Sequence, residues 1–534
     1  MTSMIQILVA LLAVVAFVAI LADRLKIPSS ILLVLAGIGL ALIPGLPSLE
    51  LAPDLVLLLV LPPVVYASSV AMSWLEFRAT LTPIIMQAVG CVIFTTAAVA
   101  AAAHYLFDFT WSVGFVLGAI VSPPDVMAPL SIARRMQLPR RILVVLEGEG
   151  LANDATALIL YRFAIVAVSS GVFSYERAIA TFSAIVIGEI VWGIGVGWLT
   201  LRLRRWAKDP RVEITISILV PYLAYWPPQH LGGSGVLATV TTGLYISWNG
   251  LRLISAATRL QGIFFWDLFI YIVEGLVFLI TGLQARTLLS RIGNHALTEL
   301  VTSGLIVCGV VIMARFIWTL PAAYLPRWLI PAIRGRNPAP PWRWPLAVAF
   351  TGIRGIVSLA AALAIPLTTA GGSPFPDRDF ILSLTFSVII VTLVGQGLAL
   401  PSFIRLLGLA HAGRLERRAD NIVEYKARLS GVMAVLERLE ELMSERRLAE
   451  EIIQPLCDRH ADRLKHIEHR IDGHDGHREL SELHDELELL LIAAERTHIN
   501  ECYRKGGLKD EARRRIEREL DLREVALARR ETDE

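Results

Sequence analysis

Apolar runs long enough to cross a bilayer recur along this chain from residue 4 to about residue 405. A helix needs about 20 apolar residues to span the hydrocarbon of a membrane. Because unpaired backbone groups are costly in lipid, runs of this length predict helices rather than loops or open strands. The sequence therefore predicts an all-α polytopic membrane protein with about 13 transmembrane helices, at residues 4–22, 29–45, 54–72, 82–104, 112–133, 142–168, 178–200, 212–227, 234–250, 263–284, 298–323, 345–368 and 380–406.

Basic residues between these runs predict the orientation of the chain. Cytoplasmic loops of membrane proteins carry an excess of Lys and Arg. When the loops between consecutive runs are numbered from the N-terminus, the odd-numbered loops hold 18 Lys and Arg residues, whereas the even-numbered loops hold 4. This contrast predicts a multi-pass protein of the cell (inner or plasma) membrane, with its N-terminus outside and its C-terminus in the cytoplasm.

Beyond residue 410 the chain becomes charged and too polar to span a bilayer. We expect a transmembrane domain at residues 1–410 and a cytoplasmic, helical regulatory domain at residues 411–534. The residue pattern by itself favours a solvated helical hairpin that packs on itself or on a second subunit over a ligand-binding role. Apolar residues recur in this tail at spacings typical of amphipathic helices with a coiled-coil-like seam. They are Ile422, Leu429, Val432, Leu436, Leu439 and Met443 in a first helix, and Leu480, Leu483, Leu487 and Leu490 in a second.

The sixth apolar run contains carboxyl groups in a segment otherwise apolar enough to cross the membrane, and its pair Asn153-Asp154 stands out. A charged side chain near the bilayer centre costs roughly 2.5–3.5 kcal/mol, and such residues usually mark an ion or proton pathway. Burial also disfavours the ionised form of a carboxyl group, so that Asp154 can hold a proton near neutral pH. The sequence therefore predicts that a proton and a monovalent cation compete for Asp154.

The fifth run is interrupted by Ser122-Pro123-Pro124-Asp125. Consecutive prolines remove backbone donors and leave the carbonyls of the preceding turn without helical partners. We expect a broken helix with Asp125 at the break, and a simple proline kink is the alternative. Because freed backbone groups help to coordinate ions in secondary transporters, the nearby carbonyls and the Ser122 hydroxyl are candidate ligands.

The twelfth run places Arg354 among small and apolar residues. An arginine at this depth needs an anionic partner, because an unpaired buried charge is costlier than a paired one. Glu149 or Glu147 could supply the carboxylate. We expect a structural ion pair, and the alternative is direct contact between Arg354 and the transported ion.

Four segments of the chain form a set: Gly118–Ala128, Glu149–Ala155, Ser234–Ala238 and Gly352–Leu359. In sequence and in order they resemble the signature segments of the monovalent cation/proton antiporters, specifically the electroneutral, bacterial-type members of the sodium/proton exchanger branch. The resemblance covers about residues 1–410. It implies a homodimer of thirteen-helix protomers with an inverted-repeat antiporter fold. Each protomer would have a dimerisation part and a core part, in which two broken helices cross beside the ion site.

This resemblance assigns roles residue by residue. Asp154 matches the family's ion-binding and proton-carrying aspartate, and Asn153 matches the neighbour that marks the electroneutral members. Asp125 matches the aspartate of the crossed unwound segment. Glu149 and Arg354 match a buried pair that holds the site.

Other positions match a less central segment or depart from the family's pattern. Glu274 resembles a residue in the helix of the dimer or gate region, where a structural or hydrogen-bonding part is expected rather than ion coordination. The usual Thr-Asp-Pro reads Pro124-Asp125-Val126 here, and the usual Ser after the glutamate is Gly150. Two side-chain oxygens that often contact the ion in this family are therefore missing.

The predicted function is secondary active antiport of Na⁺ or Li⁺ against H⁺, one for one and electroneutral. If only the loaded forms cross between inward-facing and outward-facing states, competition for Asp154 enforces the exchange. Antiport of K⁺ against H⁺ is the alternative within this class. The expected partners are the monovalent cation, the proton, the lipid bilayer and a second copy of the chain.

Three rivals come from other classes of protein. An intramembrane aspartyl protease would use Asp125 and Asp154 as a dyad, but it needs a Gly-x-Gly-Asp box, and Leu151 follows Gly148-Glu-Gly150 here. A passive cation channel and a membrane-anchored sensor remain as alternatives. No enzymatic activity, cofactor or nucleic-acid partner is predicted, and the sequence has no phosphate-binding Gly-x-x-x-x-Gly-Lys-Ser/Thr loop.

Overall fold

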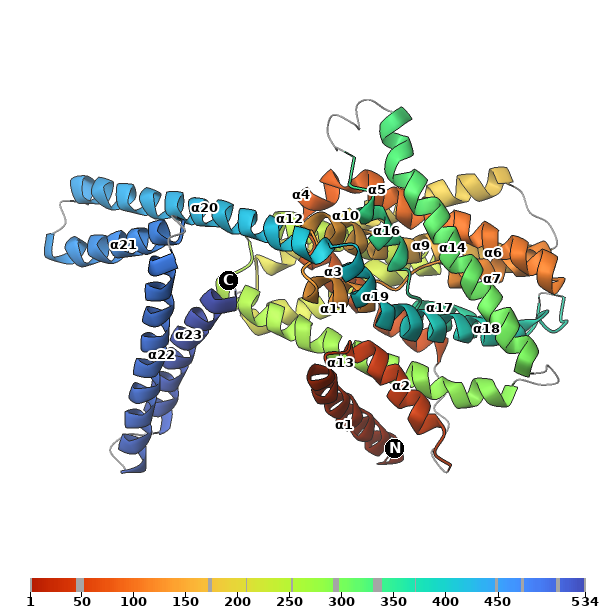
Figure 1. Cartoon of the computed structure of the whole chain (residues 1–534), viewed down its shortest axis with the longest axis horizontal. Coiled ribbons are helices and arrows are strands. Elements are labelled where there is room, and N and C mark those ends of the chain that lie inside the picture. Colours follow the sequence, from red (N-terminus) through yellow and green to blue (C-terminus); the bar gives the residue numbers. More distant parts are fainter. Residues whose placement is uncertain are drawn as a thin grey trace. The chain divides into compact units, whose positions relative to one another are not determined.

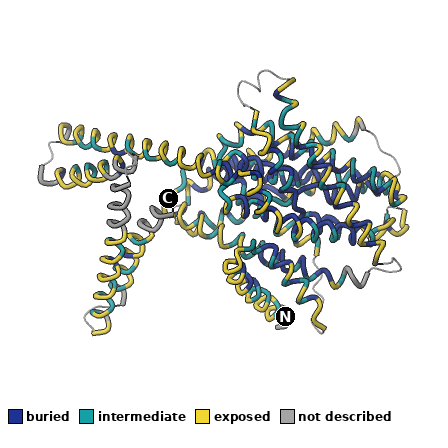
Figure 2. The backbone as a smooth tube through the Cα atoms, viewed as in Figure 1, coloured by how far each residue is buried: buried dark blue, intermediate teal, exposed yellow. Residues whose placement is uncertain are grey.

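The computed structural model divides the chain into two compact units, Met1–Arg414 and Leu415–Glu534. It describes residues 2–44, 52–170, 175–207, 209–250, 253–291, 297–329, 339–369, 371–446, 450–471, 475–505 and 510–532. Within these ranges the secondary structure is helical, apart from an isolated bridge between Thr368 and Pro374. Buried residues concentrate in the first unit, whereas much of the second unit is exposed (Figure 2).

Most helices of the first unit overlap the ranges that the apolar runs predict, whereas α4 (Trp74–Ala79) lies between two of these runs. Seven helices of the described residues are long and apolar enough to cross a membrane, and three shorter ones are apolar. In chain order the helices are α1 (Thr2–Leu25), α2 (Ser29–Ala41), α3 (Leu61–Ala71), α4 (Trp74–Ala79), α5 (Leu81–Ile85), α6 (Val92–Phe107), α7 (Trp111–Val121), α8 (Met127–Arg135), α9 (Arg140–Ser170), α10 (Tyr175–Arg204), α11 (Pro210–His230), α12 (Val236–Asn249), α13 (Ala256–Arg291), α14 (Leu297–Leu329), α16 (Arg343–Phe350), α17 (Ile356–Leu363), α18 (Arg378–Ile390) and α19 (Gly397–Leu406).

Among the described residues, three π-helical segments adjoin helices of this unit. Leu55–Val60 leads into α3, Met86–Cys91 joins α5 to α6, and Val391–Gln396 joins α18 to α19. Single turns of π-helix inside α-helices are frequent at functional sites. Two of these segments, Met86–Cys91 and Val391–Gln396, lie in the part of the unit described below as the core part.

Packing divides the first unit into two parts. In the panel part, α2 packs on α13, α12 packs on α3 and α10, and α1 and α11 complete the group (Figure 1). In the core part, α7 packs between α6 and α9, and α14 packs on α6, α16 and α18. The core part therefore contains two groups of helices far apart in sequence, α5–α9 and α14–α19, each with a broken helix at its middle.

Glycines allow the closest approaches within each part. An added Cβ at Gly37 of α2 would lie 2.9 Å from the Cα of Gly282 on α13, so these helices meet backbone to backbone. In the core part, an added Cβ at Gly114 of α7 would lie 2.9 Å from the carbonyl oxygen of Ala100 on α6. Small residues at such interfaces drive the packing of membrane helices, because they permit close van der Waals contact.

The second unit is helical as well, and its first helix covers the whole predicted seam. The seam residues Ile422 to Met443 lie in α20 (Leu409–Arg446), where Val432 is buried. A helix that the sequence analysis did not predict, α21 (Glu450–Ile471), precedes α22 (Asp475–Arg504) and α23 (Asp510–Thr532). The predicted second helix, around Leu487, lies in α22. That helix packs on α23 through Ile492 and Leu520.

Candidate functional site

Two broken helices cross in the core part. The first is interrupted between Val121, where α7 ends, and Met127, where α8 begins. The second is interrupted between Phe350, where α16 ends, and Ile356, where α17 begins. The backbone N–H of Asp125 in one break donates to the carbonyl of Ile353 in the other, at 2.7 Å. The prolines therefore produce a break rather than a simple kink.

Arg354 satisfies carbonyls that the first break frees. Its Nε donates to Val121 O at 2.9 Å and its Nη2 donates to Ser122 O at 3.3 Å, while Nη1 donates to Gly352 O. The side chain is 1% exposed. A guanidinium at the C-terminal end of α7 also complements the negative end of the helix dipole. Arg354 thus holds the two breaks together through backbone contacts.

Asp125 lies at the N-terminal ends of two half-helices, α8 and α17, whereas Arg354 lies at the C-terminal end of α7. Its Oδ1 accepts a hydrogen bond from the N–H of Met127, the first residue of α8, at 2.9 Å. Gly355, which precedes α17, lies against the same carboxylate. Helix N-termini carry partial positive charge, so the start of two half-helices stabilises an anionic group here.

The close approach at Gly355 leads to a prediction. An added Cβ there would lie 2.7 Å from the Cβ of Asp125 and still closer to its carboxylate. Gly355→Ala is expected to lower the free energy of unfolding by about 1–3 kcal/mol, the usual cost of overpacking, and to slow ion exchange. Gly309→Ala in α14 is the matched control, because no atom lies within 4 Å of an added Cβ there. Thermal unfolding in detergent and transport in vesicles check both variants; equal behaviour of the two would contradict the expectation.

Asn153 and Asp154 of α9 have different surroundings. Asn153 is fully buried, and its Nδ2 donates to the carbonyl of Pro124 in the first break at 2.8 Å. Asp154, about 100° further round the helix, lines a cavity of ≈ 860 Å³. Its carboxylate makes no hydrogen bond or ion pair with any other described residue. The neutral amide thus fixes the break, whereas the carboxyl group remains available to a ligand.

The cavity brings together residues from both parts of the unit. Asp154, Asp125 and Glu147 line it from the core part, and Glu274 lines it from α13 of the panel part. Ser358 of α17 also lines it, and the Ser358 Oγ is buried without a hydrogen-bond partner among the described residues. Carboxylate and hydroxyl oxygens are hard ligands that suit small cations.

Ser358 is a candidate that the sequence analysis missed, although it stands inside the segment Gly352–Leu359. Ser122, the predicted hydroxyl ligand, does not line the cavity. Its hydroxyl donates to the carbonyl of Ala119 at 3.3 Å, and its side chain is buried. The position of Ser358 could have indicated a ligand, because this residue is the third of α17, the half-helix that starts at the second break.

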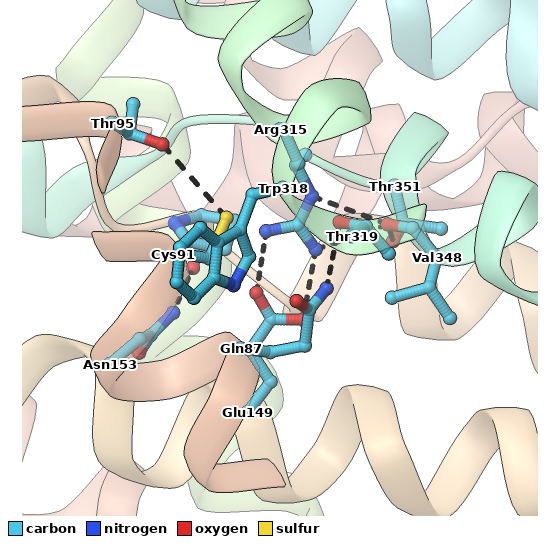
Figure 3. Close-up of polar contacts among 12 residues, drawn as sticks. Gln87, Cys91, Thr95, Glu149, Asn153, Arg315, Trp318, Thr319, Val348 and Thr351 are labelled. Carbon is cyan, nitrogen blue, oxygen red and sulfur yellow. Dashed lines mark hydrogen bonds and ion pairs between the residues drawn. The ribbon is translucent and has the colours of Figure 1, made fainter. Parts of the chain in front are cut away.

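The expected partner of Glu149 was wrong. Both carboxylate oxygens accept hydrogen bonds from Arg315 of α14, at 2.5 and 2.8 Å (Figure 3). The guanidinium of Arg354 donates to backbone carbonyls instead. Arg315 also donates to the carbonyl of Val348, at 3.2 Å from Nε and 3.1 Å from Nη2, so it links α9, α14 and α16. Glu149 is 0% exposed and Arg315 is 1% exposed. The prediction failed because Arg354 needs no carboxylate: its guanidinium is paired with backbone carbonyl oxygens.

The two remaining carboxylates lie nearer the edge of the cavity or in the panel part. Glu147 accepts a hydrogen bond from Arg134 at 2.7 Å, so it is not the partner of Arg354 either. The side chain of Arg134 is 59% exposed, which places this pair at the mouth. Glu274 has one buried carboxylate oxygen, Oε1, without a partner among the described residues.

Val126 and Gly150, two positions that depart from the family's pattern, lie against each other. An added Cβ at Gly150 would lie 2.7 Å from Cγ1 of Val126 and closer still to Cγ2. The branched side chain at 126 therefore fills the space that a serine at 150 would need. Within the described ranges, no group of three or more His, Cys, Asp or Glu residues could hold a metal ion.

Known proteins resemble the chain in sequence and in fold. Residues 9–406 match the family described as the sodium/hydrogen exchanger, transmembrane. An uncharacterized Na⁺/H⁺ exchanger of Mycobacterium tuberculosis is 32% identical over 98% of this chain and 96% of its own length. A sodium, potassium, lithium and rubidium/H⁺ antiporter of Bacillus subtilis is 32% identical over 70% of this chain and 57% of its own length. The sodium proton antiporter MjNhaP1 from Methanocaldococcus jannaschii has a similar fold, with a TM-score of 0.59 and 19% identity over 77% of this chain and 97% of that one.

Proposed function

This chain belongs to the sodium/hydrogen exchanger family, and from that membership we propose that it exchanges Na⁺ or Li⁺ for protons across the membrane, one for one, at Asp154. One observation carries the proposal: the Asp154 carboxyl group lines a cavity of ≈ 860 Å³ beside two crossed helix breaks, with no partner among the described residues. A carboxyl group in such a place binds a proton or a small cation, and each excludes the other.

The mechanism follows from competition and from the division of the unit into two parts. A proton leaves Asp154 when the cation binds, and Asp125 and Ser358 are the further candidate oxygen ligands. The loaded site then changes its exposure as the core part rocks against the panel part, as in other secondary transporters. A site that carries neither proton nor cation would leave a bare carboxylate at membrane depth, which disfavours that movement.

Asn153 supports an electroneutral exchange. Its amide is neutral and is already committed to the Pro124 carbonyl, so it adds no second titrating carboxyl beside Asp154. Asp125 keeps its hydrogen bond to Met127 and its place at the start of two half-helices in either loaded form. One proton is therefore exchanged for one monovalent cation.

The identity of the cation has a second candidate. The Bacillus subtilis relative is named for potassium and rubidium as well as for sodium and lithium. K⁺/H⁺ antiport is therefore the alternative that the similarity favours. The Asp154 carboxyl group would serve it in the same way.

We also propose the setting in which this exchange takes place. The protein would lie in the cell membrane as a homodimer, with its N-terminus outside and the domain at 411–534 in the cytoplasm as a regulator. The cavity reaches Arg134, near the end of α8, and Arg140, the first residue of α9. Both belong to the stretch between the fifth and sixth apolar runs, which shares the excess of basic residues typical of the cytoplasmic side. The cavity would then face the cytoplasm. No cofactor is needed for exchange driven by an ion gradient.

Proton flux in proteoliposomes tests the function. We expect Na⁺ or Li⁺ added outside to release protons from vesicles loaded with a pH-sensitive dye, and the rate to stay unchanged when the membrane potential is clamped at different values. K⁺ is assayed in the same way. A rate that follows the potential would contradict one-for-one exchange, and cation flux without proton counterflow would indicate a channel. A folded protein with no flux at all would favour a sensor.

A further inference from the structure

The cavity reaches Asp154 from one side only. Beyond Asp154 along α9, Ala155 and Leu158 are buried in an apolar cluster that includes Tyr225 of α11 and Val236 of α12. None of these four residues lines the cavity. Because alternating access must also expose the site on this side, the cluster forms a closed end that has to open during transport.

A hydrogen bond crosses between the two parts at this closed end. Arg162, two turns beyond Asp154 on α9 of the core part, donates through Nη1 to the carbonyl of Gly233, at 2.5 Å. Gly233 lies in the loop between α11 and α12 of the panel part. A charge-assisted hydrogen bond of this kind is stronger than a neutral one. It must break whenever the two parts separate here.

The loop that accepts this bond is held rigidly on the panel side. Glu189 of α10 is 2% exposed, and its carboxylate accepts hydrogen bonds from the N–H groups of Ser234 at 2.6 Å, Gly235 at 3.0 Å and Ala238 at 3.3 Å. The Ser234 hydroxyl donates to it as well, at 3.2 Å. A carboxylate at the start of α12 also complements the helix dipole. The Gly233 carbonyl therefore has a fixed position relative to the panel part.

The same end contains groups that favour its opening. The hydroxyl oxygens of Tyr161 and Tyr225 are buried, and neither has a hydrogen-bond partner among the described residues. Leaving a buried polar group without a partner is unfavourable. Both hydroxyls would gain water when the end opens. One strong bond favours closure and two unpaired hydroxyls favour opening, which is the balance expected of a gate with two accessible states.

We propose that Arg162 and Glu189 are positioning residues for transport, which hold shut the end of the pathway on the far side of Asp154. This inference rests on the proposed function, because a gate is needed only where the site alternates. Arg162 supplies the bond between the two parts, and Glu189 fixes the loop that receives it. Neither residue contacts the cation. Removing the bond should shift the protein towards the state in which this end is open.

Cysteine labelling tests the proposal. In a background where Cys91, Cys308, Cys457 and Cys502 are serine, Leu158→Cys places a thiol in the closed end. A membrane-impermeant maleimide is applied to reconstituted vesicles from each side in turn. With Arg162 present we expect slow labelling from the side opposite the cavity. Arg162→Ala should raise that rate roughly tenfold or more, the factor that one charge-assisted bond implies for a two-state equilibrium. Arg162→Gln keeps a hydrogen-bond donor, so its labelling rate should lie between that of the parent and the rate expected for Arg162→Ala. It replaces Arg162→Ala as the test variant if the alanine protein does not fold.

Arg343→Gln is the matched control, because Arg343 donates to the carbonyl of Leu407 at 3.3 Å within the core part alone. It should leave the labelling rate unchanged. Equal labelling of folded Arg162 variants and their parent, or an equal rise in the control, would overturn the inference. Proton flux is measured on the same vesicles. Normal flux with unchanged labelling in the Arg162 variants would refute the gate but not the proposed function. A parent protein without flux would refute the proposed function, and the labelling rates would then test only whether Arg162 keeps this end closed.

Discussion

Asp154→Asn is expected to abolish cation-driven proton flux while the protein remains folded. The asparagine has the same shape, but its amide neither titrates nor carries a charge, so it can release no proton when a cation arrives. Asp154 makes no hydrogen bond or ion pair with other described residues, so the substitution should cost little stability. Proton flux in proteoliposomes and size-exclusion chromatography in detergent measure the two effects.

Glu147→Gln is the control for this substitution. Glu147 also lines the cavity, but it pairs with the exposed Arg134 at the mouth. Exposed ion pairs contribute only about 0–1 kcal/mol, so this variant should keep most of its flux. Robust exchange by Asp154→Asn would remove Asp154 from the mechanism. Loss of flux in Glu147→Gln alone would move the site to the mouth.

Arg315→Met is expected to cause the largest loss of stability in the core part. The guanidinium and the Glu149 carboxylate form two hydrogen bonds with almost no exposure to solvent. Breaking a buried pair by removing one partner costs about 3–5 kcal/mol, because the remaining charge is left uncompensated. The thermal unfolding midpoint in detergent measures the loss.

Two comparisons make this prediction specific. Glu149→Gln combined with Arg315→Met should be more stable than Arg315→Met alone, since no unpaired carboxylate then remains. Arg140→Met removes a pair with Glu76 whose side chains are 46% and 36% exposed, and should cost only about 0–1 kcal/mol. An Arg315→Met protein that unfolds at the same temperature as the Arg140→Met protein would contradict the role assigned to the buried pair.

The sequence predicted the features of this site that depend on local chemistry. Pro123 and Pro124 lack backbone donors, so the break between α7 and α8 could be predicted from them. The apolar surroundings of Asn153 and Asp154 likewise indicate candidate functional residues. The family resemblance predicted the crossing of two breaks, which the hydrogen bond from Asp125 to Ile353 now describes at atomic detail.

The sequence could not predict which distant groups meet. Arg315 stands inside the run 298–323, but a pattern of apolar residues carries no distances between spans, so the sequence does not pair it with Glu149. Glu149 was therefore assigned to Arg354, the other buried arginine. The direction of the Ser122 hydroxyl is a matter of side-chain conformation, which the sequence does not fix either. The compensation between Val126 and Gly150 is visible only when both side chains are placed.

Proton release from the purified protein tests the central claim most directly. The protein in detergent, in weakly buffered solution with a pH indicator, is titrated with NaCl, LiCl or KCl, and with choline chloride as the control. We expect the transported cation to release one proton per protomer, more cation to be needed as the pH falls, and the Asp154→Asn protein to release none. Equal release by the Asp154→Asn protein, or binding of the cation without any release, would contradict competition between cation and proton for this carboxyl group.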